Sequence, residues 1–129
     1  MIGLPSSGVH SNGLSLMRAL VQQAGLSYTD TAPWNSAKTV GADLLTPTRI
    51  YIRSVLPLMK AGKVKAAAHI TGGGLLENLP RSLPAECAAD LDATAWELPA
   101  PIRWGISRGV MPQEALRTFN CGIGFCLVV

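Results

Sequence analysis

Three consecutive glycines at positions 72–74 constrain the fold of this chain more than any other feature of its sequence. Glycine loses more conformational freedom on folding than any other residue, so a run of three ends a helix or strand that reaches it. The run separates an apolar segment at 64–70, expected to be a strand, from a short helix expected at 75–79. A backbone without side chains can also lie close to a phosphate or a flat base.

Helical and strand-like segments alternate along the rest of the chain. Helical spacing of apolar residues predicts helices over 13–24, 48–61 and 100–108, and another from 112 through 116. Strand-like segments occur at 2–4 and 122–129, and residues 87–91 also fit a strand. Residues 27–39 are polar, contain Pro33 and are expected to form a surface loop. This order predicts an α/β or α+β domain with a mixed sheet covered by helices.

The strand expected at 122–129 reaches the last residue of the sequence, and no polar turn follows it. We therefore expect the domain to be truncated at its C-terminus. An incomplete sheet would leave this strand as an exposed edge that can pair with another chain.

The composition supports one globular domain. The chain has 129 residues, of which 48% are hydrophobic and 15% are charged. Disordered chains have the opposite balance, and a chain of this length can bury a core without disulfides or metal. The low charge content is also expected if another domain covers part of the surface.

The charge and cysteine patterns exclude several classes of partner. The formal net charge is +3, but the 11 Lys and Arg residues are spread along the chain and only 5% of residues are aromatic. Nucleic-acid binding is therefore not expected, whereas a small phosphorylated ligand suits a mildly basic protein. The three cysteines lack the spacing of a zinc site or a disulfide framework, so we expect reduced thiols and no metal site. Without a signal peptide or a long apolar run, a soluble cytoplasmic protein is expected, with no membrane partner.

The first candidate site is the loop at 5–13, which leads into the helix expected at 13–24. Small residues let backbone N–H groups approach an anion, and a helix N-terminus favours negative charge. The alternative is a tight turn in which Ser11 or Asn12 caps the helix. The phosphate-binding candidates in this loop are Ser6, Ser7, Gly8, Ser11, Asn12 and Gly13.

His10, in the same loop, is the catalytic candidate, because an imidazole can transfer protons near neutral pH. A phosphate ligand and a hydrogen-bonded structural residue are the alternatives. The nearby helix N-terminus is expected to keep the ring mostly neutral in the empty protein.

The second candidate site surrounds the three glycines. The first turn of the short helix that follows can point polar side chains back toward them, and a flexible connection is the alternative. Loops at strand ends commonly gather around a ligand, so we expect the loops at 6–13 and 71–74 to face a common cleft. The candidates here are His69, Thr71, Gly72, Gly73, Gly74, Glu77 and Asn78.

Two further segments contribute candidates. Thr118 and Asn120 lie in a polar segment before the last strand and are natural hydrogen-bonding residues for a loop; a helix C-terminal turn is the alternative. Arg49 lies in the first turn of the helix expected over 48–61, where a positive charge opposes the helix dipole. We therefore expect Arg49 to face an anionic group or a carboxylate.

Four motifs in order resemble a known family. They are SSGVHSNGLSL at 6–16, LTPTRIY at 45–51, AHITGGGLLENLPR at 68–81 and RTFNCGIG at 117–124. Together they resemble the C-terminal half of aminoimidazole ribonucleotide synthetase, also called phosphoribosylformylglycinamidine cyclo-ligase. The sequence is closer to the form found in trifunctional purine-synthesis enzymes. Leu14 departs from the family, which usually has an aromatic residue there.

The resemblance implies ring closure in de novo purine biosynthesis. ATP would activate the formyl oxygen of formylglycinamidine ribonucleotide, and a nitrogen would then displace phosphate to form aminoimidazole ribonucleotide. ATP and Mg²⁺ would be bound mainly outside this chain, by an N-terminal domain in a homodimer, while this chain supplies the substrate side. The alternatives are another ATP-using enzyme of the same superfamily, or a non-catalytic fragment that binds a nucleotide or a partner domain.

Overall fold

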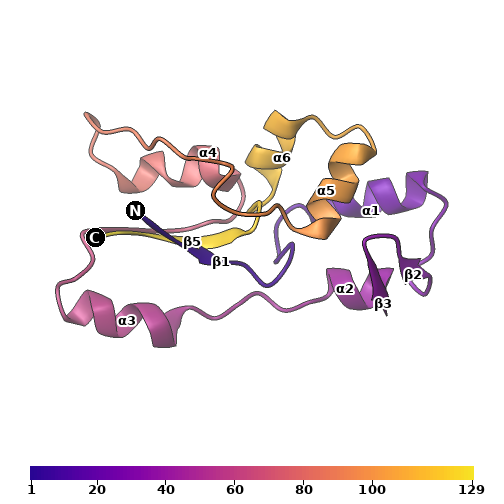
Figure 1. Ribbon diagram of the computed structural model, residues 1–129, viewed down its shortest axis with the longest axis horizontal. Helices are drawn as coiled ribbons and strands as arrows, with labels where there is room; N and C mark the ends of the chain where they lie inside the picture. The colour runs from indigo at the N-terminus through magenta and orange to yellow at the C-terminus, as the bar shows by residue number, and fades with distance from the viewer.

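The computed structural model describes residues 1–129 and shows an α+β domain, as the sequence predicts (Figure 1). In chain order the elements are β1 (Ile2–Pro5), α1 (Leu14–Gln23), β2 (Thr31–Ala32), β3 (Asn35–Thr39), α2 (Val40–Leu44), α3 (Ile52–Lys60), β4 (Ala66–His69), α4 (Gly74–Asn78), the short 3₁₀ helix η1 (Pro80–Ser82), α5 (Ala100–Ser107), α6 (Pro112–Thr118) and β5 (Ile123–Val128).

The main sheet has three strands in the order β1-β5-β4, and both pairings are antiparallel. The sheet is therefore antiparallel and not mixed. The expectation that the last strand forms an exposed edge is wrong, because β5 lies at the centre with a partner on each side. A six-residue strand of mostly apolar residues is best placed there, where both of its hydrogen-bonding edges are satisfied.

The two faces of the sheet pack against different helices. Side chains alternate along a strand, so Cys126 of β5 joins the larger core with α1, α4, α5 and α6, whereas its neighbour Leu127 faces α3. The smaller cluster on the α3 face contains Tyr51, Val55 and Leu127. In Figure 1, α3 accordingly lies on the opposite side of the sheet from α4 and α6.

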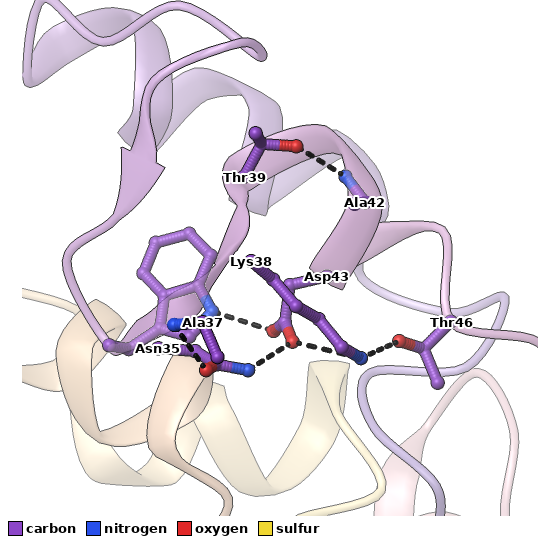
Figure 2. Close-up of polar contacts among 8 residues, drawn as sticks. Asn35, Ala37, Lys38, Thr39, Ala42, Asp43 and Thr46 are labelled. Carbon is purple, nitrogen blue, oxygen red and sulfur yellow. Dashed lines mark hydrogen bonds and ion pairs between the residues drawn. The ribbon is translucent and has the colours of Figure 1, made fainter.

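Residues 27–39 differ most from the surface loop that the sequence predicts. They contain the hairpin β2–β3, which is followed directly by α2. The carboxylate of Asp43 in α2 accepts hydrogen bonds from the Trp34 indole at 2.7 Å and from the Asn35 amide at 2.9 Å. Figure 2 shows this carboxylate between Asn35 and Lys38, whose ammonium group lies 3.5 Å away. These contacts between segments stabilise a hairpin that local sequence preference does not indicate.

Three local expectations are also corrected. The helix expected over 48–61 begins only at Ile52, because residues 46–51 have no regular structure and lie against the first loop. Residues 87–91 form no strand, since no other strand pairs with them. The N-cap of α1 is Gly13, in the left-handed conformation with φ 84° and without a side-chain cap.

Candidate functional site

The topology of the sheet brings the predicted loops to one edge. β1 and β4 both run antiparallel to β5, so they run parallel to each other and end at the same edge. Pro5 at the end of β1 lies opposite Ile123, and His69 at the end of β4 lies opposite Phe125. The loops that follow these strands, and the segment that precedes β5, therefore meet there.

The side chains and glycines of these three segments are in close contact. A Cβ atom placed on Gly72 would lie 3.5 Å from the side-chain nitrogen of Asn12. On Gly13 it would overlap the ring of Phe119, and on Gly74 it would overlap the carbonyl oxygen of Leu116. At Gly13 and Gly74 the glycines thus allow the segments to approach each other, which is a packing role that the sequence analysis did not assign.

Asn120 ties the first loop to the segment before β5. Its side chain is almost fully buried, with 2% exposed. Its amide nitrogen donates to the carbonyl oxygens of Gly8 at 2.9 Å and Val9 at 3.1 Å, and its oxygen accepts from the N–H of Gly122 at 2.8 Å. The amide is therefore engaged by backbone groups, which makes Asn120 a positioning residue.

Asn78 has the same role in the glycine loop. Its amide nitrogen donates to the carbonyl oxygens of Gly74 at 2.7 Å and Gly72 at 3.1 Å. Its oxygen lies 3.3 Å from the hydroxyl of Thr71. Asn78 thus closes the loop on itself, and direct contact of Asn78 or Thr71 with a ligand stays a prediction.

His10 is buried at the junction of these segments. It has a left-handed backbone with φ 61°, and 5% of the residue is exposed. Its Nε2 accepts the backbone N–H of Ser7 at 3.0 Å and that of Arg49 at 3.5 Å. These two donors assign the proton of the neutral ring to Nδ1, which is buried and has no partner.

Burial is the largest influence on the titration of this ring. It lowers the pKa of His10 below its usual value of 6.5, and the positive charges of His69 and Arg49 act in the same direction. This direction agrees with the prediction of a mostly neutral His10 in the empty protein, which stays a prediction. The causes are burial and neighbouring positive charges, whereas the sequence suggested the helix dipole.

Arg49 and Tyr51 hold the segment 46–51 against the first loop. The carbonyl oxygen of Pro5 accepts a hydrogen bond from Arg49 Nη1 at 3.1 Å and another from the Tyr51 hydroxyl at 2.9 Å. The Ser7 hydroxyl donates to the carbonyl oxygen of Pro47 at 2.7 Å. Arg49 therefore faces a carbonyl oxygen, and no carboxylate pairs with it.

The other polar candidates point in different directions. Glu77 forms an ion pair with Arg81 at 3.1 Å, and Thr118 donates to the Glu114 carboxylate at 2.7 Å. His69 stacks on Phe125 with ring centroids 5.7 Å apart. Ser11 is exposed. Roles in ligand binding for these residues stay predictions.

Two cavities open at this edge of the sheet, and neither is lined by both glycine-containing loops. The first, of about 480 Å³, lies between α3 and the sheet and is mostly apolar, with Arg49, Tyr51, His69 and Phe125 in its wall. The second, of about 360 Å³, is mostly polar and is lined by 6–8, the β2–β3 hairpin, α2 and residues near 97–101. The first cavity is lined by neither loop and the second by 6–8 but not 71–74, so neither is the common cleft expected between the loops.

Sequence reasoning missed three residues of this region. Tyr51 lies within the helix expected over 48–61, and no sequence pattern singles out Trp34 or Asp43. Tyr51 and Trp34 act through contacts with distant segments, with Pro5 and with the ring of Trp104 respectively, whereas Asp43 binds the neighbouring hairpin. No local pattern indicates them.

Metal-binding and membrane-spanning features are absent. No group of three or more His, Cys, Asp or Glu side chains is arranged to hold a metal ion. None of the helices has the length and apolar character needed to cross a membrane.

Comparison with known proteins identifies the domain. The chain matches the family described as "AIR synthase related protein, C-terminal domain" over residues 1–129. The chain belongs to this family. The resemblance to aminoimidazole ribonucleotide (AIR) synthetase that the four motifs predict is thereby confirmed.

The similar curated proteins are multifunctional enzymes of purine biosynthesis. The chain is 51% identical to the "Trifunctional purine biosynthetic protein adenosine-3" of Chironomus tentans and 52% identical to that of Bos taurus, each over 131 residues. It is 45% identical over 130 residues to the "Bifunctional purine biosynthetic protein PUR2,5" of Pichia angusta. The whole chain is covered in each case, but only 10%, 13% and 16% of the respective relative.

Proposed function

We propose that this chain supplies the substrate side of a phosphoribosylformylglycinamidine cyclo-ligase, which closes the imidazole ring of aminoimidazole ribonucleotide at the expense of ATP. The main support is His10, buried at the junction of three segments and with a pKa lowered by that burial, in a domain of the AIR synthase family. The relatives that cover the whole chain are purine biosynthetic enzymes.

The reaction needs positioning and proton transfer more than a covalent nucleophile. ATP phosphorylates the formyl oxygen of formylglycinamidine ribonucleotide, a substrate nitrogen attacks that carbon, and phosphate leaves with the oxygen. The attacking nitrogen loses a proton as the ring closes. This chain would hold the ribonucleotide so that the nitrogen and the carbon meet, which lowers the entropic cost of ring closure.

His10 is suited to donate a hydrogen bond or a proton through Nδ1. Its Nε2 is occupied by two backbone N–H groups, so a hydrogen bond or proton to the ligand would have to come from Nδ1–H. Nδ1 is buried and His10 lines neither cavity, so this role requires the segments around the ring to move apart when the ligand binds. An anionic ligand would raise the proton affinity of the ring and favour this donor role. To accept a proton at Nε2, the ring would first have to lose its contacts with Ser7 and Arg49.

ATP and Mg²⁺ are proposed to bind elsewhere in the complete enzyme. This chain has no group of carboxylates arranged for a metal ion, so we assign it no step that involves one. An N-terminal domain of the same enzyme, in a cytoplasmic homodimer, is the proposed source of both sites.

The experiment measures ring closure by the complete enzyme that contains this domain, with the His10→Asn substitution. Asparagine tolerates the left-handed backbone at this position but cannot transfer a proton. We expect kcat to fall by about 10²–10⁴-fold with KM changed little. The control is Gln23→Ala, an exposed position at the end of α1 that is not a site candidate, which should have little effect.

Two results would contradict parts of this proposal. If the unsubstituted enzyme forms no aminoimidazole ribonucleotide from formylglycinamidine ribonucleotide and ATP, the proposed function is wrong. If His10→Asn weakens substrate binding and leaves kcat unchanged, His10 is a ligand for the substrate and not a proton donor.

A further inference from the structure

Gly124 lies inside the central strand of the main sheet, where a glycine weakens the structure. It is the second residue of β5 and the last residue of the motif RTFNCGIG at 117–124. A glycine inside a strand often marks a bulge or a close approach by another group. The φ of Gly124 is not positive, so an alanine could adopt the same backbone. What this position uses is therefore the absence of a side chain.

The pairing of β1 with β5 is irregular at this glycine. Leu4 lies opposite Phe125, but the next residue of β1, Pro5, lies opposite Ile123. Gly124 is thus the extra residue of a β-bulge. Bulges are frequent beside active sites, where they redirect the groups around them.

Two side chains fill the space above Gly124. A Cβ atom placed there would overlap the hydroxyl oxygen of Tyr51 and would lie 2.7 Å from Cε1 of His10, whereas ordinary contacts are 3.4–4 Å. Both residues are buried, with 7% of Tyr51 and 5% of His10 exposed. Their rings are neighbours, with centroids 6.4 Å apart. Glycine is the residue that leaves room for both rings on this strand.

The contact at Cε1 is important because this carbon joins the two nitrogens of the His10 ring. On one side of it, Nε2 accepts the backbone N–H groups of Ser7 at 3.0 Å and Arg49 at 3.5 Å. On the other side, Nδ1 carries the proton of the neutral ring. A ring displaced at Cε1 would therefore move both nitrogens.

Gly124 is also held more firmly than the segments that cover the ring. Its carbonyl oxygen accepts the N–H of Ile70 at 3.0 Å, just after the end of β4. The Tyr51 hydroxyl reaches across the bulge to the carbonyl oxygen of Pro5 at 2.9 Å. The first loop and the segment 46–51 have no regular structure. If these two segments move apart when a ligand binds, the central strand remains the fixed surface under the ring.

We propose that Gly124 is a positioning residue for His10, because its missing side chain determines where both ring nitrogens lie. This inference rests on the proposed function, in which His10 donates a hydrogen bond or a proton to the ribonucleotide. Gly124 would act through His10 and would not contact the substrate. The alternative is that Gly124 only makes room for Tyr51.

The first experiment follows the His10 ring in the 129-residue chain by NMR of the ring nitrogens, at a pH well above 6.5. The chain has two histidines, and the signals that disappear in His69→Gln identify the other one. We expect the proton on Nδ1 in the unsubstituted chain. Gly124→Ala should give a mixture of the two tautomers, because Nε2 moves away from its two backbone N–H donors.

Gly3→Ala is the matched control for this experiment. Gly3 is a strand glycine of the same sheet, and its φ is not positive either. A Cβ atom placed there would meet only the side chain of Ile123, at 3.2 Å. This substitution should leave the tautomer of His10 unchanged.

The second experiment measures ring closure by the complete enzyme with the same two substitutions. Gly124→Ala should lower kcat by about 10²-fold, the effect of misplacing a reacting group by about 1 Å. KM should change little, because Gly124 does not contact the substrate. Gly3→Ala should leave both constants close to those of the unsubstituted enzyme.

Combining Gly124→Ala with Tyr51→Phe separates His10 from Tyr51, and it relieves the overlap if Gly124→Ala alone does not fold. Phenylalanine lacks the hydroxyl group that the Cβ atom would overlap, but the contact with His10 Cε1 remains. Compared with Tyr51→Phe alone, the double variant should still show mixed tautomers and a lower kcat. If the double variant matches Tyr51→Phe in both measurements, Gly124 only makes room for Tyr51 and the inference is wrong.

A folded Gly124→Ala chain with an unchanged His10 tautomer would also overturn the inference. A changed tautomer with an unchanged kcat would support the positioning of His10 and reject its proposed part in the reaction. If the unsubstituted enzyme forms no aminoimidazole ribonucleotide, the proposed function is wrong, and the tautomer measurement still decides whether Gly124 positions the ring.

Discussion

Replacing Asn120 by alanine should show how strongly the site depends on one buried amide. The Asn120 side chain makes three hydrogen bonds to the backbone, to the carbonyl oxygens of Gly8 and Val9 and from the N–H of Gly122. The carbonyl partners lie 112 and 111 residues away along the chain, so no local structure can replace these bonds. Each hydrogen bond contributes about 1 kcal/mol, and each buried backbone group left unpaired costs about 1–3 kcal/mol.

We expect Asn120→Ala to lower the free energy of unfolding by about 3 kcal/mol, measured by urea denaturation with an unchanged m-value. For a chain of this length, that is a decrease in Tm on the order of 10 °C. Asn12→Ala is the matched control, because Asn12 lies in the same loop and its side chain makes no hydrogen bond; it should change the free energy by less than about 0.5 kcal/mol. A loss below about 1 kcal/mol in Asn120→Ala would refute the reasoning, since it would mean that water replaces the amide at no cost.

Three further predictions concern other parts of the domain. The pKa of His10 is lower in the folded state than its usual 6.5, so the unfolded state binds more protons. The free energy of unfolding should therefore fall as the pH drops from above 6.5 through the folded pKa. His10→Asn should reduce this pH dependence in denaturation curves measured across that range. Gly74→Ala places a Cβ against the carbonyl oxygen of Leu116 at a φ of +58°, so it should lower the free energy of unfolding by more than about 2 kcal/mol. The control Gly25→Ala has φ +68° but no neighbour within 4 Å, and it should lower the free energy of unfolding by only about 1 kcal/mol. Equal losses would mean that the close approach of Gly74 to α6 is not important. Burial raises the pKa of Cys121 and of Cys126 to about 11, so a thiol reagent at neutral pH should modify only the exposed Cys87 until the protein unfolds; rapid modification of all three thiols would contradict this.

The class of the domain and most of its elements follow from local features of the sequence. The helix at Leu14–Gln23 and the strand at Ala66–His69 follow from the periodicity and end signals of their own residues. The glycine loop and the family motifs were likewise visible as continuous stretches. These features are local, so a single segment contains the information that specifies them.

The tertiary structure alone decided how those segments are arranged. The last strand became the centre of the sheet because β1 and β4, separated by some sixty residues, both find hydrogen-bonding partners on it. The β2–β3 hairpin packs Ala32 into the main core and Trp34 against Trp104 of α5, and Asp43 of α2 binds it, although its own residues predict only a loop.

The chemistry of the candidate site was decided in the same way. The sequence placed small residues and a histidine in one loop, but only the fold shows that the Ser7 N–H is used by His10 and that Arg49 and Tyr51 bind the Pro5 carbonyl. A hydrogen bond depends on the distance and direction between two groups, and the fold sets both when it brings remote segments together. Residue type therefore indicated which groups could act, and tertiary contacts determined which of them are still free to do so.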